Sequence, residues 1–210
     1  NTDGLTNAGN FSTDGGTIKL DGNYPTGTDN VALGNTALDD GSLSGGYNVA
    51  IGSGALSENE AGTQNSAVGY NSLDANTSGK CNTGIGNNAL GTNISACNNT
   101  AIGNQSMQAN TTGASNTAVG SCALKANTTA ADNTAVGYQA LQDNTTGVRN
   151  VALGKNALAN NTTADNSQAI GYNALVNNTT GCQNVALGSS ALQANTTGDN
   201  NISIGISSLY

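Results

Sequence analysis

Residues 133–149 read NTAVGYQALQDNTTGVR, and variants of this 17-residue unit fill most of the chain. The fifth residue of the unit is a glycine that occurs eleven times, first at an interval of 18 residues and then at nine intervals of 17. These glycines are Gly34, Gly52, Gly69, Gly86, Gly103, Gly120, Gly137, Gly154, Gly171, Gly188 and Gly205. A period kept this closely is typical of a solenoid, in which each unit forms one coil and stacks on the next. The sequence therefore predicts a rod of stacked coils.

The composition of each position in the unit predicts its local structure. We number the unit so that Asn133 is position 1 and Gly137 is position 5. Position 3 is Ala, Gly or Ser, position 4 is aliphatic in every unit, and position 9 is Leu except at Met107. Alternation over positions 2–4 predicts a short strand with position 3 on one face and positions 2 and 4 on the other. The glycine predicts a positive φ or a very close backbone approach, and the Asn-Thr-Thr-Gly segment at positions 12–15 predicts a polar turn.

A single coil of this kind is too thin to be stable alone. The aliphatic side chains at positions 4 and 9 bury too little surface to offset the entropy lost when the whole coil is ordered. We expect the Asn side chains at positions 1 and 12 to form ladders along the stack, each amide bonding to the next. We also expect chains to associate side by side, with the small residues of position 3, such as Ala118 and Ala135, facing a neighbouring chain.

The charge balance disfavours two classes of partner. The net charge is −8, and the basic residues are few and dispersed: Lys19, Lys80, Lys125, Arg149 and Lys155. Such a pattern does not neutralise a phosphate backbone or an anionic bilayer, so we expect no nucleic-acid or membrane-surface partner. No apolar run approaches the roughly 20 residues of a membrane span, so we expect no membrane insertion. Because the chain starts at Asn1 without an initiator Met and stops at Tyr210 within a unit, we expect a segment of something longer.

Residues suited to catalysis do not cluster in the sequence. The chain has no His, and its acidic residues are scattered over loops and polar corners, as at Asp39, Asp40, Glu58 and Glu60. General acid–base chemistry needs a positioned pair of such groups. We therefore expect no enzyme activity, no catalytic residue, no metal site and no organic cofactor.

The cysteines and the Asn-Thr-Thr triplets have structural interpretations. The four cysteines lack the Cys-x-x-Cys spacing and His partners of a zinc site: Cys81, Cys97, Cys122 and Cys182. Cys81 and Cys97 fall at nearly the same phase of consecutive units, so a disulfide between them is one alternative and free thiols are the favoured one. The triplets match the N-glycosylation sequon, which we expect as a by-product of turn chemistry: Asn110, Asn127, Asn144, Asn161, Asn178 and Asn195.

The unit resembles the head repeats of a known family. NVAIG at 48–52, NTAIG at 99–103 and NTAVG at 116–120 and 133–137 look like the YadA-like head repeats of trimeric autotransporter adhesins. The resemblance covers about residues 30–210 and implies a left-handed parallel β-roll of eleven coils, a homotrimer about a threefold axis, and adhesion. Residues 1–29 are expected to form an irregular leading segment. No coiled-coil neck or membrane anchor accompanies the repeats in this sequence.

The corner of the unit resembles a second group of proteins. The 17-residue length and the Asn-Thr-Thr-Gly corner are similar to long arrays in bacteriophage tail fibres and other virion fibres, and residues 15–34 are similar to the start of such repeats. The leading hypothesis is therefore a non-enzymatic structural fibre segment on the virion surface, acting as a spacer or a host-attachment rod. Its expected partners are other copies of itself and, for attachment, a host surface glycan or protein bound at positions 10–17.

Two alternatives stay open. The first is the head domain of a bacterial trimeric surface adhesin, which is extracellular at the cell surface. The second is an ice-binding solenoid, because regular Thr columns are typical of such proteins. Thr111 and Thr112 are adjacent, however, and adjacent residues of an extended chain face opposite ways, so the corner does not predict a flat Thr-x-Thr grid.

Overall fold

In a computed structural model, which describes residues 29–209, the only regular elements are eleven β-strands of three residues each. They are β1 (Val31–Leu33), β2 (Val49–Ile51), β3 (Ser66–Val68), β4 (Thr83–Ile85), β5 (Thr100–Ile102), β6 (Thr117–Val119), β7 (Thr134–Val136), β8 (Val151–Leu153), β9 (Gln168–Ile170), β10 (Val185–Leu187) and β11 (Ile202–Ile204). Each strand occupies positions 2–4 of a unit, as the alternation predicts. The irregular segment expected over residues 1–29 lies outside the described residues, except for Asp29.

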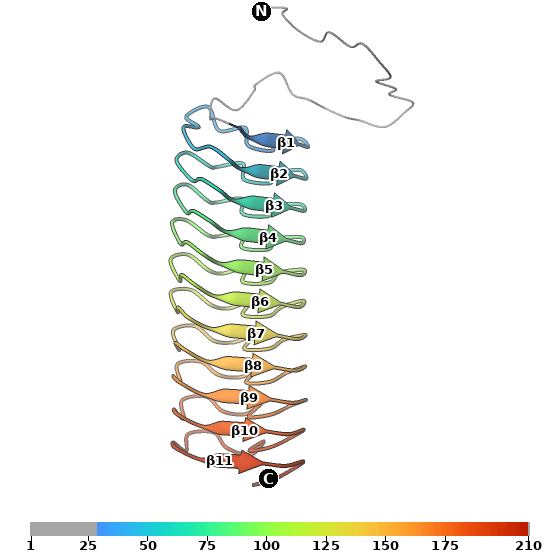
Figure 1. The fold of residues 1–210 in the computed structure, drawn as a ribbon, viewed down its shortest axis with the longest axis vertical. Coiled ribbons are helices and arrows are strands. Elements are labelled where there is room, and N and C mark those ends of the chain that lie inside the picture. The colour runs from blue at the N-terminus through green and yellow to red at the C-terminus, as the bar shows by residue number, and fades with distance from the viewer. Residues whose placement is uncertain (1–28, 210) are drawn as a thin grey trace, which may run out of the picture.

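The eleven strands form one parallel sheet whose order follows the chain. Pairing is in register from coil to coil, so that Ala135 of β7 pairs with Ala152 of β8 and Val136 pairs with Leu153. Figure 1 shows the strands stacked one above another along the long axis of the rod. The prediction of an all-β solenoid of parallel coils is therefore confirmed.

Backbone hydrogen bonds between coils continue beyond the short strands. The Gly154 N–H donates to the Val136 carbonyl at 2.8 Å, just after the strand. On the other side of the coil, the Leu141 N–H donates to the Ala157 carbonyl at 3.0 Å. Consecutive coils are therefore hydrogen-bonded around most of their circumference. These bonds pair backbone N–H and C=O groups that strands of only three residues cannot pair.

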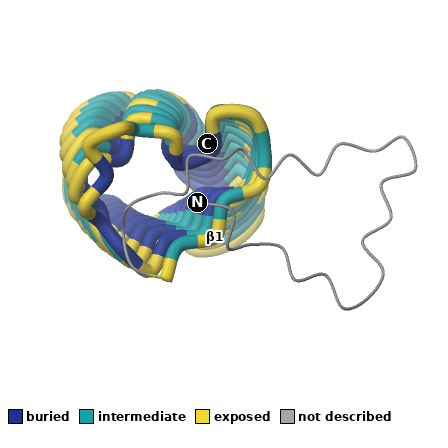
Figure 2. The backbone as a smooth tube through the Cα atoms, turned by 90° about the horizontal axis from the view of Figure 1, so that it is seen from above, coloured by how far each residue is buried: buried dark blue, intermediate teal, exposed yellow. Residues whose placement is uncertain are grey.

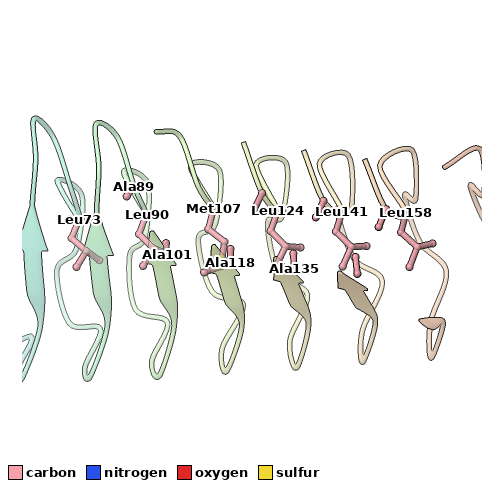
Figure 3. Packing of buried hydrophobic residues seen from close by; sticks show 14 of the residues in the cluster. Leu73, Ala89, Leu90, Ala101, Met107, Ala118, Leu124, Ala135, Leu141 and Leu158 are labelled. Carbon is pink, nitrogen blue, oxygen red and sulfur yellow. The ribbon is translucent and has the colours of Figure 1, made fainter. Parts of the chain in front are cut away.

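The interior of the coils is filled by columns of small and medium apolar side chains. Ala135 at position 3, Ala140 at position 8 and Leu141 at position 9 are all fully buried. Seen along the axis, buried residues line the inside of the coils and exposed residues the outside (Figure 2). Figure 3 shows alanine and leucine side chains of successive coils, such as Leu124 and Ala135, meeting in this interior. The core is one narrow column that extends along the rod.

The structure corrects the expectation that position 3 faces a neighbouring chain. Ala118 and Ala135 are 0% exposed within a single chain, whereas Val136 at position 4, which we expected inside, is 38% exposed. The reason is that the coil is narrow. Gly84, at position 3, illustrates this, because a Cβ added there would lie 3.3 Å from Leu73 Cγ. In a close-packed interior this narrow, the strand has room for only small residues on its inner face. Its bulky residues therefore point outward.

Four positions of the regular coil have a positive φ. Gly137 at position 5 has φ 137°, and a Cβ added there would lie 2.5 Å from the Gly154 carbonyl oxygen, so both sequence-based explanations for this glycine hold. Gln139, Leu141 and Arg149 at positions 7, 9 and 17 have φ values of 58°, 51° and 56°. Such values are uncommon for residues with a bulky side chain. These local reversals close each coil within 17 residues.

Candidate functional site

The buried asparagine at position 1 links each coil to the next. Asn133 is 1% exposed; its Oδ1 accepts the Asn150 N–H of the following coil at 2.9 Å. Its Nδ2 donates to the Gly147 carbonyl of its own coil at 2.9 Å and to Asn116 Oδ1 of the preceding coil at 3.2 Å. One amide therefore holds together three coils, and the predicted ladder at position 1 is confirmed.

A second asparagine ladder runs at position 12 and meets the first. Asn144 Nδ2 donates to Asn127 Oδ1 of the preceding coil at 3.2 Å and to the Gly147 carbonyl at 2.9 Å. The Gly147 carbonyl thus accepts from both Asn133 and Asn144. The sequon asparagines at this position are fully buried, except for the half-buried Asn195: Asn110, Asn127, Asn144, Asn161 and Asn178. Because their amide nitrogens are buried and bonded, the sequon matches serve the turn in the folded chain.

The two threonines of each Asn-Thr-Thr corner have different roles: the first makes a hydrogen bond between coils, and the second is exposed. The Thr111 hydroxyl at position 13 donates to the Thr128 carbonyl of the next coil at 3.0 Å, and Thr145 bonds to Thr162 in the same way. Thr112 at position 14 is exposed. The paired threonines therefore face different ways, as expected, and the position-13 hydroxyls are already used by the backbone.

Side chains at position 16 accept backbone N–H groups from the preceding coil. Asp165 Oδ1 accepts the Val148 N–H at 2.7 Å, and Cys97 Sγ accepts the Lys80 N–H at 3.3 Å. Cys182 lies between two aspartates: its Sγ accepts the Asp165 N–H at 3.4 Å, and its N–H donates to Asp199. These carboxylates and sulfurs complete the hydrogen bonding of the corner, which is a structural role.

Among residues 29–209, the acidic residues and cysteines named above do not come together in a reactive centre. All four cysteines are free thiols there, so Cys81 and Cys97 are not joined. No group of three or more metal-ligating side chains gathers in that range. Asp40 accepts hydrogen bonds from the Ser42 hydroxyl and, at 2.7 Å, from the Ser42 N–H, which hold the pKa of the Asp40 carboxyl below its usual value. Asp39, Glu58 and Glu60 are exposed around the corners.

The outer sheet face, which we define as positions 2 and 4 of β1–β11, is a surface of similar chemistry that repeats in every coil. It carries no charged side chain; position 4 is Val, Ile or Leu throughout, and position 2 is mostly Val or Thr. Ile51, Ile102, Val136 and Ile170 are each 38% exposed. Contiguous exposed apolar surface commonly marks a site of association. Sequence reasoning missed this face, although small residues at position 3 beside bulky ones at position 4 were the available signal.

Aromatic side chains form a second exposed feature, at position 6 just beyond the strands. Tyr138 is 47% exposed and Tyr172 is 51% exposed. Lys155, at the same position of the coil between them, places its Nζ 5.8 Å from the Tyr138 ring centroid and 5.9 Å from the Tyr172 centroid. These residues were not predicted as a site from the sequence, although their 17-residue spacing places them in one column.

Comparison with protein-family models, curated proteins and solved structures finds no match to the chain. Within residues 29–209, no helix has the length and apolar character needed to cross a bilayer. The two exposed features of the rod that could contact a partner are the outer sheet face and the column that contains Tyr138, Lys155 and Tyr172.

Proposed function

We propose that this chain is a structural fibre segment of a bacteriophage virion, without enzyme activity, that serves as a spacer or host-attachment rod on the virion surface. The observation that carries this proposal is the outer sheet face, which repeats one uncharged aliphatic surface in every coil. A surface repeated along a rod suits lateral packing against identical rods. The unit's resemblance to virion fibre repeats supports the same assignment.

The proposed assembly is a homotrimer of left-handed coils, as the resemblance to YadA-like heads implies, with its interface moved from position 3 to the outer sheet face. Covering the remaining third of a position-4 side chain such as Val136 contributes roughly 0.5–1 kcal/mol. The same contact is available from β1 to β11, so small contributions accumulate along the rod. Association then stabilises coils whose own interior is narrow.

Sedimentation velocity tests the assembly directly. The wild-type chain is expected to sediment as a trimer, and the double variant Val119→Lys, Val136→Lys as a monomer whose circular dichroism still shows β-structure. The matched control is Thr129→Lys, Thr146→Lys, which places the same charges on exposed corner residues of the same two coils. A wild-type chain that remains monomeric at every concentration contradicts the trimer, and a double variant that remains trimeric contradicts the interface.

The head domain of a bacterial trimeric surface adhesin is the second candidate. It is favoured by the Asn-x-Ala-aliphatic-Gly core of the unit, in which the asparagine forms the ladder and the glycine makes the close approach between coils. Both candidates require the same rod and the same lateral interface. The sequence flanking this segment in the full-length protein separates them: a coiled-coil stalk and membrane anchor indicate an adhesin, and a virion-docking domain indicates a phage fibre.

A further inference from the structure

Tyr138, Lys155 and Tyr172 form an exposed column on three consecutive coils, which we call the tyrosine column. Each residue is at position 6, so the three side chains follow the axis of the rod. The lysine ammonium lies close to both rings, at 5.8 and 5.9 Å from their centroids. Both distances are within the range of a cation–π contact. The column is therefore an ordered arrangement of two aromatic side chains and one cationic side chain on the outside of the coils.

The lysine at the centre of the column has no anionic partner. Lys155 is exposed, and its ammonium makes no hydrogen bond or ion pair with the described residues 29–209. The chain as a whole carries a net charge of −8, so this position is a local exception to its acidic character. An ammonium without a carboxylate partner still has its capacity to bind an anion.

The two rings are spaced for an extended ligand. Tyr138 and Tyr172 are two coils apart, which corresponds to about 10 Å along the axis at the usual distance between strands. The same position is occupied by Ser121 in the coil before the column and by Ser189 in the coil after it. These small residues leave both ends of the column open, so a long polymer can continue past it.

We propose that the tyrosine column binds an extended polysaccharide that carries carboxylate groups. Sugar rings stack their C–H faces on the exposed faces of Tyr138 and Tyr172, since tyrosine combines an apolar ring with a polar hydroxyl. A carboxylate of the intervening sugar pairs with the Lys155 ammonium through a charge-assisted hydrogen bond. The half-buried Gln139, at the neighbouring position 7, has a side-chain amide that makes no hydrogen bond with the described residues and is available to a sugar hydroxyl.

The charge and the shape of the column favour this ligand over a protein or a neutral glycan. A protein partner typically buries a broad patch of surface, whereas the column is a single line of three side chains. A neutral glycan stacks on the tyrosines but leaves the lysine unpaired. The inference rests on the attachment role in the proposed function, because a rod that only spaces needs no such column.

Titration of the intact chain with polygalacturonate fragments tests the proposal, with cello-oligosaccharides of equal length as the neutral probe. The chain has six Tyr and no Trp, so tyrosine fluorescence and calorimetry both report binding. We expect polygalacturonate to bind with an affinity that falls as salt is added. We expect Tyr172→Ala to weaken binding at least tenfold and Lys155→Gln to remove the preference over the neutral probe.

Tyr70→Ala is the matched control, because Tyr70 is also exposed at position 6 but the next coil carries Asn87 instead of a lysine. We expect it to bind like the wild type. Equal binding by Tyr172→Ala and wild type, no binding of polygalacturonate by the wild type, or equal binding of the neutral probe each overturns the proposal. Sedimentation of the same variants separates this result from the proposed function: loss of the trimer in Tyr172→Ala assigns the column to assembly and also overturns the proposal.

Discussion

Ala135 and Val136 are neighbours on β7, yet they occupy opposite environments. Ala135 is 0% exposed inside the coil, and Val136 is 38% exposed on the outer sheet face. In a globular sheet, the larger aliphatic side chain usually points to the core. Here the coil is too narrow for it, so the larger residue points outward and remains partly covered. The difference teaches that the inner face determines whether a chain can coil, whereas the outer face determines what the coil associates with.

The largest effect is expected at the closest contact between coils. Gly137→Ala places a Cβ 2.5 Å from the Gly154 carbonyl oxygen at a φ of 137°, where neither the backbone nor the new methyl group can be accommodated. We expect the free energy of unfolding to fall by about 3 kcal/mol or more in denaturant titrations. Gly91→Ala is the control, because a Cβ added there meets no atom closer than 3.4 Å and alanine already stands at this position of another unit, in Ala159. Equal losses for the two variants would contradict the argument.

A somewhat smaller loss is expected from filling the inner face. Ala135→Leu forces a larger side chain against the leucine column, and overpacking of this kind costs about 2–3 kcal/mol. Val136→Leu makes the neighbouring side chain larger on the outside, where we expect a change within about 0.5 kcal/mol. Thermal unfolding of both variants checks the comparison. If the outer substitution is the more damaging of the two, the assignment of faces is wrong.

The inner polar ladder is expected to be next in importance. Asn133→Ala leaves the Asn150 N–H without its acceptor and removes one of two donors from the Gly147 carbonyl. A buried donor without a partner costs about 1–3 kcal/mol. We expect a loss near the middle of that range in denaturant titrations. Asn160→Ala, at an exposed asparagine, serves as the control and should be close to neutral.

The smallest effect is a gain at the one coil whose ladder is interrupted within residues 29–209. Ser167 replaces the position-1 asparagine; its Oγ accepts the Asn184 N–H at 3.3 Å and donates to the Gly181 carbonyl at 3.4 Å. Ser167→Asn restores the longer amide, and we expect about 1 kcal/mol of added stability. The control is Ser190→Asn, at a position where Asn156 and Asn173 occur naturally. No gain over that control would show that the serine costs nothing.

The sequence predicted those features that depend on one residue type at one phase. Gly137 at position 5 indicated a close approach, Asn133 and Asn144 indicated ladders, and the alternation over positions 2–4 indicated the strands. Each follows from local chemistry that repeats in every unit. The parallel solenoid was therefore accessible from the sequence.

Three features were not predictable in the same way. Alternation states which residues share a face but not which face is inside, so Ala135 and Val136 were assigned the wrong way round. The left-handed backbone of Leu141, with φ 51°, runs against the ordinary preference of leucine and depends on packing of its side chain in the completed coil. The tyrosine column required the same kind of information, because it arises only when three coils are stacked.

The interrupted ladder at Ser167 also has a mechanical consequence. Tension applied along the rod passes through the interfaces between coils one after another, so every interface bears the full force and none can share it. Interfaces that are loaded in series separate first at the weakest of them. The contact of Ser167 with Asn184 of the next coil is longer, at 3.3 Å, than the corresponding 2.9 Å contact of Asn133 with Asn150. Under tension, the rod is therefore expected to separate first between the coils of β9 and β10, with the stiffer coils on either side remaining wound.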